Sequence, residues 1–412
     1  MTTLSGLTSF DKVGKVDKED PVDRVRNPYT PNAGSAPPVL AGRDAELKDF
    51  ESVLERLASG KTDKAVAAIG LRGVGKTVLL GEFERIAREH NWVAVPAEIS
   101  KTKEFGPQLA NLVRKALFQL SPKARWNDVA KRAAGVIRSF SMTVQPDGAL
   151  TAGLDVEKID GAADSGQFDE DLADVLESLG ETARDVRRGV VFLLDEIQFL
   201  SKDELEALIG AIHRCIQRRL PITVACAGLP QLPGVAGDAK SYAERLFHYI
   251  QVIELGPADA RQAIVAPAAE EGVRFEDAAV DAIIEYTDGY PYFLQEFGRW
   301  VWDLAEGPVI TAAEVADARY LVEAELDESF FKTRVQRSTK EELRYLRAMA
   351  ALGPEPQKAS DVAEQLGKTS EQVAPLRARL IAKGLLYTPK FGFAEFTVPQ
   401  FDKFMLRYIP DF

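Results

Sequence analysis

The sequence contains little cysteine and histidine, with two cysteines (Cys215 and Cys226) and three histidines among 412 residues. Two cysteines cannot form the dense disulfide framework of a small secreted domain. The histidines stand at positions 90, 213 and 248 without the clustered spacing of zinc ligands, and His213 beside Cys215 is typical of a helix surface. These shortages exclude a disulfide-stapled protein and a zinc-finger protein.

Long apolar runs are also missing. No run approaches the roughly 18 apolar residues of a membrane span, and residues 1–20 lack the apolar core of a secretion signal. We therefore expect a cytoplasmic protein with no membrane contact. A net charge of −12 argues against a surface that coats nucleic acid as a whole, so any DNA contact must be local. With 46% hydrophobic residues, the chain can bury large cores, and its length indicates two or three domains.

Residues 64–83, KAVAAIGLRGVGKTVLLGEF, combine a buried-strand pattern with phosphate-binding chemistry. An apolar run at 65–69 precedes a glycine-rich turn and an amphipathic helix, and the turn matches G-x-x-x-x-G-K-[ST]. In this motif, backbone N–H groups and a helix N-terminus surround phosphate oxygens. The predicted nucleotide-binding residues are Gly70, Leu71, Arg72, Gly73, Val74, Gly75, Lys76, Thr77 and Val78. Lys76 should reach the β- and γ-phosphates and Thr77 should ligate Mg²⁺. A glycine turn with a surface lysine is the simpler alternative.

The run VVFLLDE at 190–196 supplies the acidic groups that such a loop needs. Asp195, at the tip of an apolar strand, is predicted to hold the Mg²⁺ shell. Glu196 is predicted to be the base that polarises an attacking water. Alternatively, the two acids only end a strand or cap the next helix.

The chain as a whole predicts an α/β fold, a P-loop NTPase parallel sheet with a helical lid and a C-terminal winged helix. Further strands are expected at 92–99, 222–227 and 249–255. Alternation about Pro146-Asp147-Gly148 predicts a β-hairpin inserted at about 141–157. The expected divisions are a flexible Pro-rich arm at 1–38, which could instead dock on the folded body, the ATPase core at 39–256, the lid at 257–337 and the winged helix at 338–412.

These motifs give the chain a resemblance to P-loop ATPases of the AAA+ and STAND superfamilies. It resembles archaeal-type ATPases and the origin-recognition and replication-licensing initiators in particular. GLRGVGKT and LLDEIQ are the specific signatures, whereas VLAGRDAEL, AERLF and DGYPYFLQ are less specific, and together they cover about residues 39–412. The resemblance implies ATP or ADP with Mg²⁺ as ligands and ATP hydrolysis as the activity.

The resemblance also implies roles for residues outside the glycine loop. It implies that Gly42 and Arg43 lie near adenine, where the alternative is an ordinary helix cap. It implies that Pro291, with Tyr290 as a weaker candidate, packs near the nucleotide, where the alternative is a helix-start proline. It also implies that Arg245 acts as an arginine finger on a neighbouring subunit, which would make self-association part of catalysis. A solvated arginine is the alternative there.

Two positions depart from the pattern that the resemblance implies. Ala227 and Gly228 stand where a polar sensor residue is usual at the tip of the fourth strand, and Tyr292 stands where the lid usually carries an arginine. Arg299, further along the same predicted helix, is a weak substitute. Both departures indicate slow turnover, or a nucleotide switch in place of a motor.

The last 75 residues have a net charge of +2, from 11 basic and 9 acidic residues. In the predicted helix 369–383, the apolar residues face the core and the polar residues face outward, as a major-groove helix requires. The candidate DNA contacts are Gln372, Arg379, Lys383 and, on the wing, Lys390. Winged helices also serve as protein contacts, and a charge of +2 leaves that alternative open.

The function predicted from sequence is a weakly hydrolysing, Mg²⁺-dependent ATPase that couples its nucleotide state to DNA binding. The alternative is a nucleotide-switched scaffold whose winged helix and N-terminal arm bind protein partners.

Overall fold

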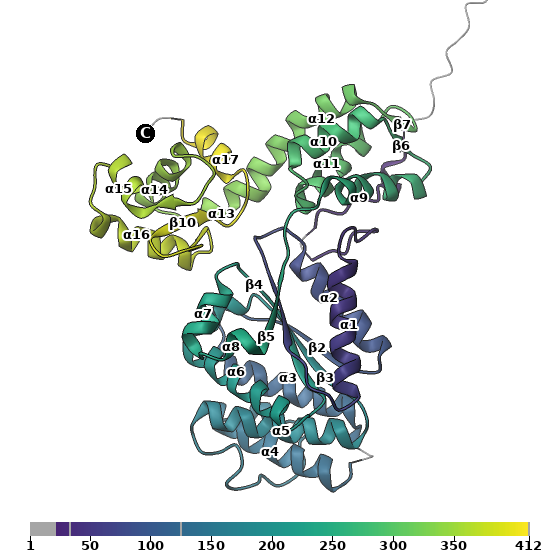
Figure 1. Ribbon diagram of the computed structural model, residues 1–412, viewed down its shortest axis with the longest axis vertical. Coiled ribbons are helices and arrows are strands. Elements are labelled where there is room, and N and C mark those ends of the chain that lie inside the picture. Colours follow the sequence, from purple (N-terminus) through teal and green to yellow (C-terminus); the bar gives the residue numbers. More distant parts are fainter. Residues whose placement is uncertain (1–21, 33, 124–125, 411–412) are drawn as a thin grey trace, which may run out of the picture.

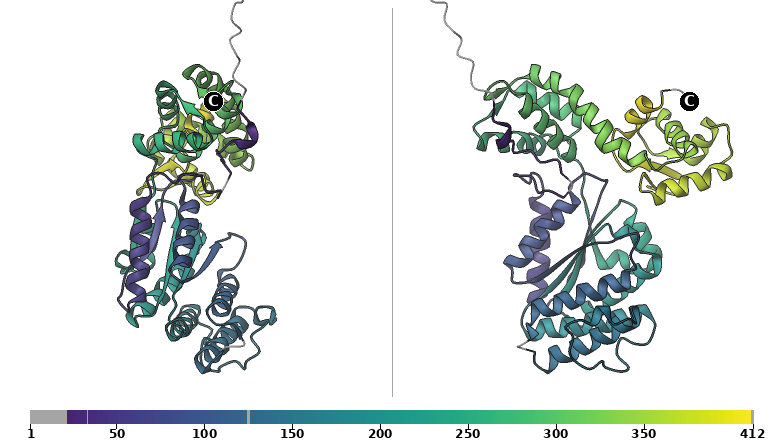
Figure 2. Two further views of the ribbon diagram at one scale, coloured as in Figure 1. Left: turned by 90° about the vertical axis from the view of Figure 1, so that its right-hand side faces the viewer. Right: turned by 180° about the vertical axis from the view of Figure 1, so that it is seen from behind.

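A computed structural model of the chain describes residues 22–410, except 33 and 124–125. Three groups of elements follow one another along the chain: a sheet with helices, a bundle of short helices and a small C-terminal unit (Figure 1). The second and third groups lie beyond one end of the sheet (Figure 2). None of the described helices combines the length and apolar character needed to cross a membrane.

The first group is built on a parallel five-stranded sheet in the order β2-β3-β4-β1-β5. Its strands are β1 (Ala65–Ile69), β2 (Val93–Glu98), β3 (Val190–Asp195), β4 (Ile222–Gly228) and β5 (Phe247–Gln251). The first four agree with the predicted strands to within a residue or two. The fifth begins earlier than predicted, because Phe247 and not Tyr249 pairs with Ala65 at the start of β1.

Helices cover both faces of this sheet, as near-continuous apolar strands require. The core on one face contains α1 (Asp44–Ala58) and α2 (Lys76–Glu89). The core on the other face contains α3 (Phe105–Leu120), α4 (Asp128–Val144), α5 (Phe168–Asp185), α6 (Lys202–Gln217), α7 (Leu232–Ala239) and α8 (Ala243–Leu246). Alternate residues of β1 divide between the two cores. The α/β prediction is therefore confirmed.

The hairpin predicted at about 141–157 is wrong. Helix α4 continues to Val144, and a 3₁₀ turn (Ala149–Thr151) follows. The polar residues of α4 do not disrupt it, because the hydroxyls of Ser139, Ser141 and Thr143 donate to carbonyls four residues earlier. The Pro-Asp-Gly sequence does form a turn, with Gly148 at φ 77°, but this turn follows a helix end.

The second group comprises α9 (Pro257–Glu270), α10 (Asp277–Thr287), α11 (Pro291–Leu304) and α12 (Ala312–Glu325), with the short strands β6 (Arg274–Phe275) and β7 (Val309–Ile310). We call these elements the lid helices. A π-helical segment (Leu326–Lys332) and α13 (Thr333–Val335) continue α12, and we call residues 326–335 the linker helix. The continuous helix that begins at Ala312 is thus α-helical only as far as Glu325.

The described part of the N-terminal arm packs on the lid helices, so the prediction of a flexible arm is wrong for residues 22–32 and 34–38. The ring of Tyr29 is buried in the gap that Gly298 leaves by having no side chain, and its hydroxyl donates to the Ile264 carbonyl. Trp302 Nε1 donates to the Asp23 carbonyl at 3.0 Å. The buried Tyr29 ring and these hydrogen bonds offset the conformational entropy that the arm loses when it becomes ordered. Residues 1–21 of the predicted arm lie outside the described part.

The third group, residues 338–410, is called the C-terminal unit below. It contains α14 (Lys340–Ala351), β8 (Gln357–Lys358), α15 (Ala359–Gln365), α16 (Ser370–Ala382), β9 (Leu386–Tyr387), β10 (Phe393–Phe396) and α17 (Phe401–Tyr408). The strands form an antiparallel sheet in the order β8-β10-β9. Capping boxes at Thr339 and Thr369 begin α14 and α16, and α16 agrees with the predicted helix 369–383. The sequence analysis did not predict α17.

Candidate nucleotide site

The glycine-rich loop between β1 and α2 has the geometry that its sequence predicts. Gly73 and Gly75 have φ values of 89° and 96°, which side chains rarely tolerate. A Cβ atom on Gly70 would lie 2.1 Å from the Val252 carbonyl oxygen, so that position also requires glycine. The loop leads directly into the N-terminus of α2, with Gly75 as the residue before the helix, and helix N-termini of this kind favour anions.

Lys76, the first residue of α2, lies back over this loop. Its Nζ donates to the carbonyl oxygens of Gly70 at 2.9 Å and Leu71 at 2.6 Å. Burial lowers the pKa of Lys76 to about 8, although the nearby carboxylates Glu196 and Asp195 oppose the shift. A buried ammonium held by carbonyl dipoles is a strong site for a phosphate oxygen.

Thr77 and Asp195, both predicted Mg²⁺ ligands, contact each other. Thr77 Oγ1 donates to Asp195 Oδ2 at 2.6 Å. The contact joins the first turn of α2 to the carboxyl end of β3. A hydroxyl and a carboxylate oxygen side by side provide the oxygen ligands that Mg²⁺ prefers.

Glu196, the predicted base, follows Asp195 in a left-handed conformation with φ 55°. Arg72 Nη2 lies 3.6 Å from its Oε2, and Gln198 Nε2 also donates to Oε2. In this arrangement Glu196 is occupied by two donors. To act as the predicted base, the carboxylate would have to exchange these contacts.

Gln198 also compensates for one departure noted in the sequence. Its Oε1 accepts a hydrogen bond from Leu229 N at 3.3 Å and lies 3.1 Å from where a Cβ on Gly228 would be. A polar side chain therefore does lie beside the tip of β4, although it comes from the turn after β3. The sequence analysis missed Gln198 because it examined β4 alone.

A cavity of about 360 Å³ adjoins the loop. The predicted residues that line it are Arg43, Arg72, Gly73, Val74, Gly75, Lys76, Thr77, Val78, Asp195, Glu196 and Pro291. Gly70 and Leu71 contribute carbonyls to Lys76 just behind the cavity, and Gly42 precedes Arg43. Arg43 is buried, and its Nη2 donates to the Ile253 carbonyl at 2.6 Å and, more weakly, to the Val74 carbonyl at 3.4 Å. Arg43 thus fixes the loop against the segment after β5, in addition to lining the cavity.

The lid helices and the linker helix form the opposite wall of this cavity. Their lining residues are Pro291, Tyr292, Leu294, Gln295, Phe330 and Arg334. Tyr290 packs on the loop, since its hydroxyl oxygen lies 3.2 Å from where a Cβ on Gly73 would be. Tyr292 stacks on Phe330 and donates from its hydroxyl to Glu296 Oε1 at 3.0 Å.

The arginine on this wall is Arg334, which the sequence analysis did not single out. Arg299, its suggested substitute, is not among the described residues that line the cavity, and its guanidinium lies over the Trp300 ring. No local motif marks Arg334, since it lies 39 residues beyond the end of the predicted lid motif DGYPYFLQ, in a helix without a turn signal.

The N-terminal arm forms the third wall, which sequence reasoning also missed. Its lining residues are Thr30, Pro31, Asn32, Gly34, Ser35 and Pro37, and Val39, Leu40 and Ala41 at the start of the core continue this wall. The backbone N–H of Thr30 donates to Gln295 Oε1 at 3.1 Å, which ties the arm to α11. A tyrosine between prolines was the available signal, because a buried aromatic can anchor an otherwise extended segment.

Arg245 lies at the other end of the sheet. It is exposed and lines a separate hollow with Lys64 and Tyr242, next to the start of β5. The glycine loop follows the opposite end of β1, one strand length of roughly 16 Å away. Arg245 therefore cannot reach the nucleotide site of its own chain.

The basic residues predicted to contact DNA are largely engaged within the C-terminal unit. Arg379 Nε and Lys383 Nζ lie 3.2 Å and 2.6 Å from the carboxylate of Glu342, which is fully buried on α14. Gln372 closes the capping box of α16 by accepting from Thr369 N at 2.9 Å. Lys390 is exposed and lies 4.0 Å over the Phe393 ring. Of the four, Gln372 and Lys390 have no ionic partner among the described residues.

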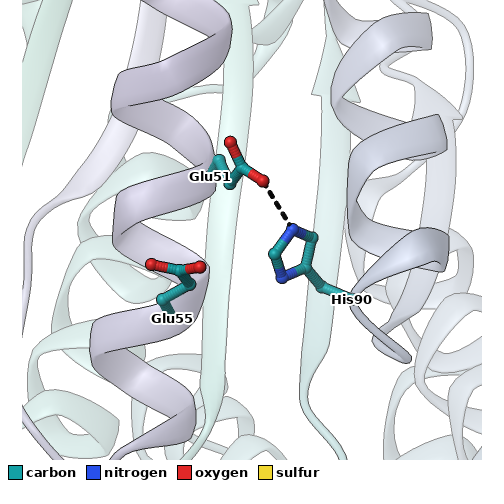
Figure 3. A group of neighbouring side chains, drawn as sticks. All are labelled: Glu51, Glu55 and His90. Carbon is teal, nitrogen blue, oxygen red and sulfur yellow. Dashed lines mark hydrogen bonds and ion pairs between the residues drawn. The ribbon is translucent and has the colours of Figure 1, made fainter.

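Glu51, Glu55 and His90 form another group of possible ligands, between α1 and the end of α2 (Figure 3). His90 Nε2 lies 2.8 Å from Glu51 Oε1, and all three side chains are at least partly exposed. No bond from the second ring nitrogen to another described residue is seen, whereas metal-bound histidines usually have one. We interpret the group as a link between two helices.

Comparison with known proteins agrees with this geometry. Residues 39–225 match the model of the AAA ATPase domain, and residues 328–405 match the model of a domain of unknown function. No curated protein matches the sequence. The parallel sheet, the glycine loop and the family match together define the class of this part of the chain, which is a P-loop ATPase domain. More particularly, residues 39–225 form an ATPase domain of the AAA+ class.

Solved structures resemble the chain over most of its length. A Walker-type ATPase of Pyrococcus abyssi is 13% identical with a TM-score of 0.52, covering 89% of this chain and 96% of its own. The ORC1 protein of Aeropyrum pernix, solved in complex with DNA, is 15% identical with a TM-score of 0.47, covering 93% and 96%. The RuvB Holliday junction branch migration motor of Thermotoga maritima is 17% identical with a TM-score of 0.44, covering 86% and 92%. The first likeness shows a shared fold.

Proposed function

We propose that the protein is an ATP-switched ATPase in which the state of the nucleotide loop controls the position of the C-terminal unit. The observation that supports this most directly is a hydrogen bond between the two. The backbone N–H of Arg72, within the loop, donates to the Thr397 carbonyl oxygen at 3.1 Å. Lys101 Nζ donates to the Ala382 carbonyl at the end of α16. Closure of the loop round phosphates would therefore disturb the contact with the C-terminal unit.

The residues around the cavity fit Mg-ATP as the substrate. The backbone N–H groups of the loop and Lys76 would hold the β- and γ-phosphates. Thr77 and Asp195 would hold Mg²⁺, because their oxygens are 2.6 Å apart at the N-terminus of α2. When bound, Mg²⁺ neutralises charge on the phosphates. The N-terminal arm and Arg43 would close the nucleoside end of the cavity.

Glu196 would accept the proton of the attacking water. Its present contacts with Arg72 and Gln198 favour slow basal turnover. Both donors stabilise the charged carboxylate and occupy the oxygen that would otherwise accept the proton of water. Arg72 belongs to the loop that touches Thr397, so release of the C-terminal unit could free Glu196 at the same time. This link supports a switch in preference to a continuously working motor.

We propose that residues 39–256, 257–337 and 338–412 act as ATPase core, lid and winged helix, and that α16 of the winged helix engages DNA. The order of three helices and an antiparallel ribbon supports the winged-helix assignment. Gln372 and Lys390 would contact DNA directly. Arg379 and Lys383 would first have to leave Glu342.

The pairing of Arg379 and Lys383 with Glu342 favours a second candidate, a nucleotide-switched scaffold that binds a protein partner. In this alternative, Arg379 and Lys383 are not available to phosphates, because both are paired with Glu342. Both candidates assume a cytoplasmic protein. They also leave room for self-association, in which Arg245 would act on the nucleotide of a neighbouring chain.

Turnover and DNA binding by the full chain separate these candidates. We expect Mg²⁺-dependent ATP hydrolysis that rises with duplex DNA, and DNA affinity that falls steeply with salt. Lys76→Ala is the matched control for hydrolysis by contaminants. Absence of DNA binding at low salt, with and without ATP, would contradict the DNA candidate and leave the scaffold. Turnover that rises with protein concentration, but not in Arg245→Ala, would support the role in self-association.

A further inference from the structure

Arg334 is a partly buried cation without an acidic partner on the wall of the nucleotide cavity. Its guanidinium lies 3.7 Å over the Phe330 ring and donates to the Phe330 carbonyl. No carboxylate among the described residues forms an ion pair with it. Charged groups taken out of water usually have a counter-charge, so this one requires an explanation.

A second cation lies close to the first. Burial, together with the charge of nearby Arg72, lowers the pKa of Arg334 to about 10. Tyr290 and Tyr292 act in the opposite direction and raise this pKa. Arg72 itself has a buried Nε with no hydrogen-bond partner in the described structure. Two guanidinium groups that repel each other, with a spare donor, form a site for an anion.

The position of the pair within the cavity indicates which anion. Arg72 lies 3.6 Å from Glu196, so the pair is at the end of the cavity that holds the predicted base. Lys76, Thr77 and Asp195 line the same cavity, whereas the N-terminal arm closes its other side. The anion nearest the base in this arrangement is the terminal phosphate of ATP.

We propose that Arg334 binds the terminal phosphate of ATP and thereby reports its presence to the C-terminal unit. The proposal rests on the proposed function and adds to it a residue that distinguishes ATP from ADP. A guanidinium suits the role because it can donate two parallel hydrogen bonds to one phosphate. It would act from the linker helix, in contrast to Tyr292, which holds Glu296 within the lid.

The place of Arg334 in the chain explains how it would transmit the signal. Arg334 belongs to α13, directly before the C-terminal unit. Lys383 Nζ at the end of α16 donates to the Arg337 carbonyl at 2.8 Å, which ties α16 to the residues that follow α13. A movement of Arg334 toward phosphate would therefore move the C-terminal unit with it.

The test compares Arg334→Met with Arg334→Lys and a control. Methionine keeps most of the length of the side chain and its contact with Phe330 but removes the charge. The control is Lys332→Met, because Lys332 lies on the same linker helix and pairs with Glu328 at 2.7 Å, away from the cavity. Calorimetric titration with Mg-ATP and Mg-ADP gives the ATP-to-ADP affinity ratio for each protein.

We expect Arg334→Met to weaken ATP binding roughly 10- to 100-fold and ADP binding less than about threefold. Arg334→Lys should lie between this variant and the wild type, and Lys332→Met should equal the wild type. If Arg334→Met keeps the wild-type ratio while Lys76→Ala loses ATP, the role of Arg334 is wrong and the proposed function stands. If the wild type binds no nucleotide, the proposed function itself fails.

A second measurement tests whether Arg334 transmits the presence of ATP to the C-terminal unit or only stabilises the fold. Fluorophores on Lys61→Cys in the ATPase core and Phe391→Cys in the C-terminal unit report the distance between them, because both positions are exposed and Cys215 and Cys226 are buried. Saturating ATP should change energy transfer in the wild-type background and not with Arg334→Met. If the Arg334→Met protein changes its energy transfer with ATP as the wild type does, the proposal is wrong. It is also wrong if Arg334→Met loses ATP and ADP affinity equally and has a lower melting temperature.

Discussion

Two groups of basic side chains in this protein are held in opposite ways. Around the nucleotide cavity, Lys76 donates to backbone carbonyls and Arg334 has no acidic partner among the described residues. On α16, Arg379 and Lys383 share the buried carboxylate of Glu342. Both groups were predicted or proposed to bind phosphates, yet only the first is arranged with donors left for an anion.

The difference shows that charge alone does not define a phosphate site. A cation that already has a buried carboxylate must give up that pairing before it binds a phosphate, whereas a cation held by dipoles gains a charge partner when the phosphate arrives. The comparison therefore favours nucleotide binding over DNA binding as the primary role of basic side chains here.

Lys76→Ala should have the largest effect, about a 100-fold loss of ATP affinity measured by calorimetry, because it removes a charged hydrogen bond to phosphate. Lys61→Ala, on an exposed lysine, is the matched control. The pKa of about 8 adds a pH dependence. Above about pH 8 the free protein loses the proton that phosphate binding requires, so wild-type affinity should fall up to tenfold per pH unit. Tight ATP binding by Lys76→Ala would contradict the site.

Glu342→Gln tests the second group of cations through stability. Burial alone would raise the pKa of Glu342, but hydrogen bonds from Lys383, the Thr339 backbone and Arg379 outweigh it and lower the pKa to about 2. Since the folded pKa lies below the unfolded value of about 4.3, the charge stabilises the fold above about pH 4. This contribution, on the order of 2 kcal/mol, is lost as the pH falls toward 2.

Urea unfolding of the wild type and Glu342→Gln at about pH 7 and pH 3 measures this contribution. The difference in unfolding free energy should shrink at the lower pH, and a constant difference would show that the carboxylate charge is unimportant. The same variant addresses the comparison above. If α16 binds DNA, release of Arg379 and Lys383 should raise low-salt DNA affinity several-fold, and an unchanged affinity would favour the protein-partner alternative.

Thr77→Ala should have an intermediate effect on the metal side of the site. The wild type should bind ATP more tightly when Mg²⁺ is added, and loss of one oxygen ligand should reduce this gain about tenfold. Thr62→Ala, on an exposed threonine, is the control. A gain from Mg²⁺ that equals the wild type would mean that Thr77 only positions Asp195 through their hydrogen bond.

The sequence predicted those parts of the molecule whose chemistry lies in one short segment. The glycine loop, Thr77 and Asp195 are specified by a strand, a turn and a helix within a few residues, and each has the geometry expected. Capping boxes at Thr339 and Thr369 likewise begin two helices of the C-terminal unit within a few residues. Local sequence is sufficient where the structure is determined locally.

The sequence could not predict features that depend on distant segments. Gln198 fills the place beside Gly228 from the turn after β3, and Arg334 reaches the cavity from the linker helix. Tyr29 is ordered because Gly298 leaves room for its ring, a match across more than 250 residues. The wrongly predicted hairpin shows that a local signal can also mislead when its neighbours belong to another element. A local turn signal at Gly148 was combined with an alternation that belongs to α4.

The smallest expected effect belongs to Lys101, which joins the two groups compared above. Its Nζ donates to the last turn of α16 and lies 4.4 Å over the Phe199 ring. Burial and the nearby charge of Arg72 lower the pKa of Lys101, whereas Glu196 acts to raise it. Lys101→Met should weaken the contact with the C-terminal unit by about 0.5–1 kcal/mol, because one charged hydrogen bond on a partly exposed surface is lost.

Hydrogen exchange at the end of α16 should then be about two- to fivefold faster without nucleotide. With saturating ATP, the wild type and Lys101→Met should exchange at the same rate, because the proposed switch has already released this contact. Lys103→Met, on an exposed lysine two residues away, is the control. Faster exchange in Lys101→Met that persists under ATP would mean that the contact is static and that the nucleotide loop does not control the C-terminal unit.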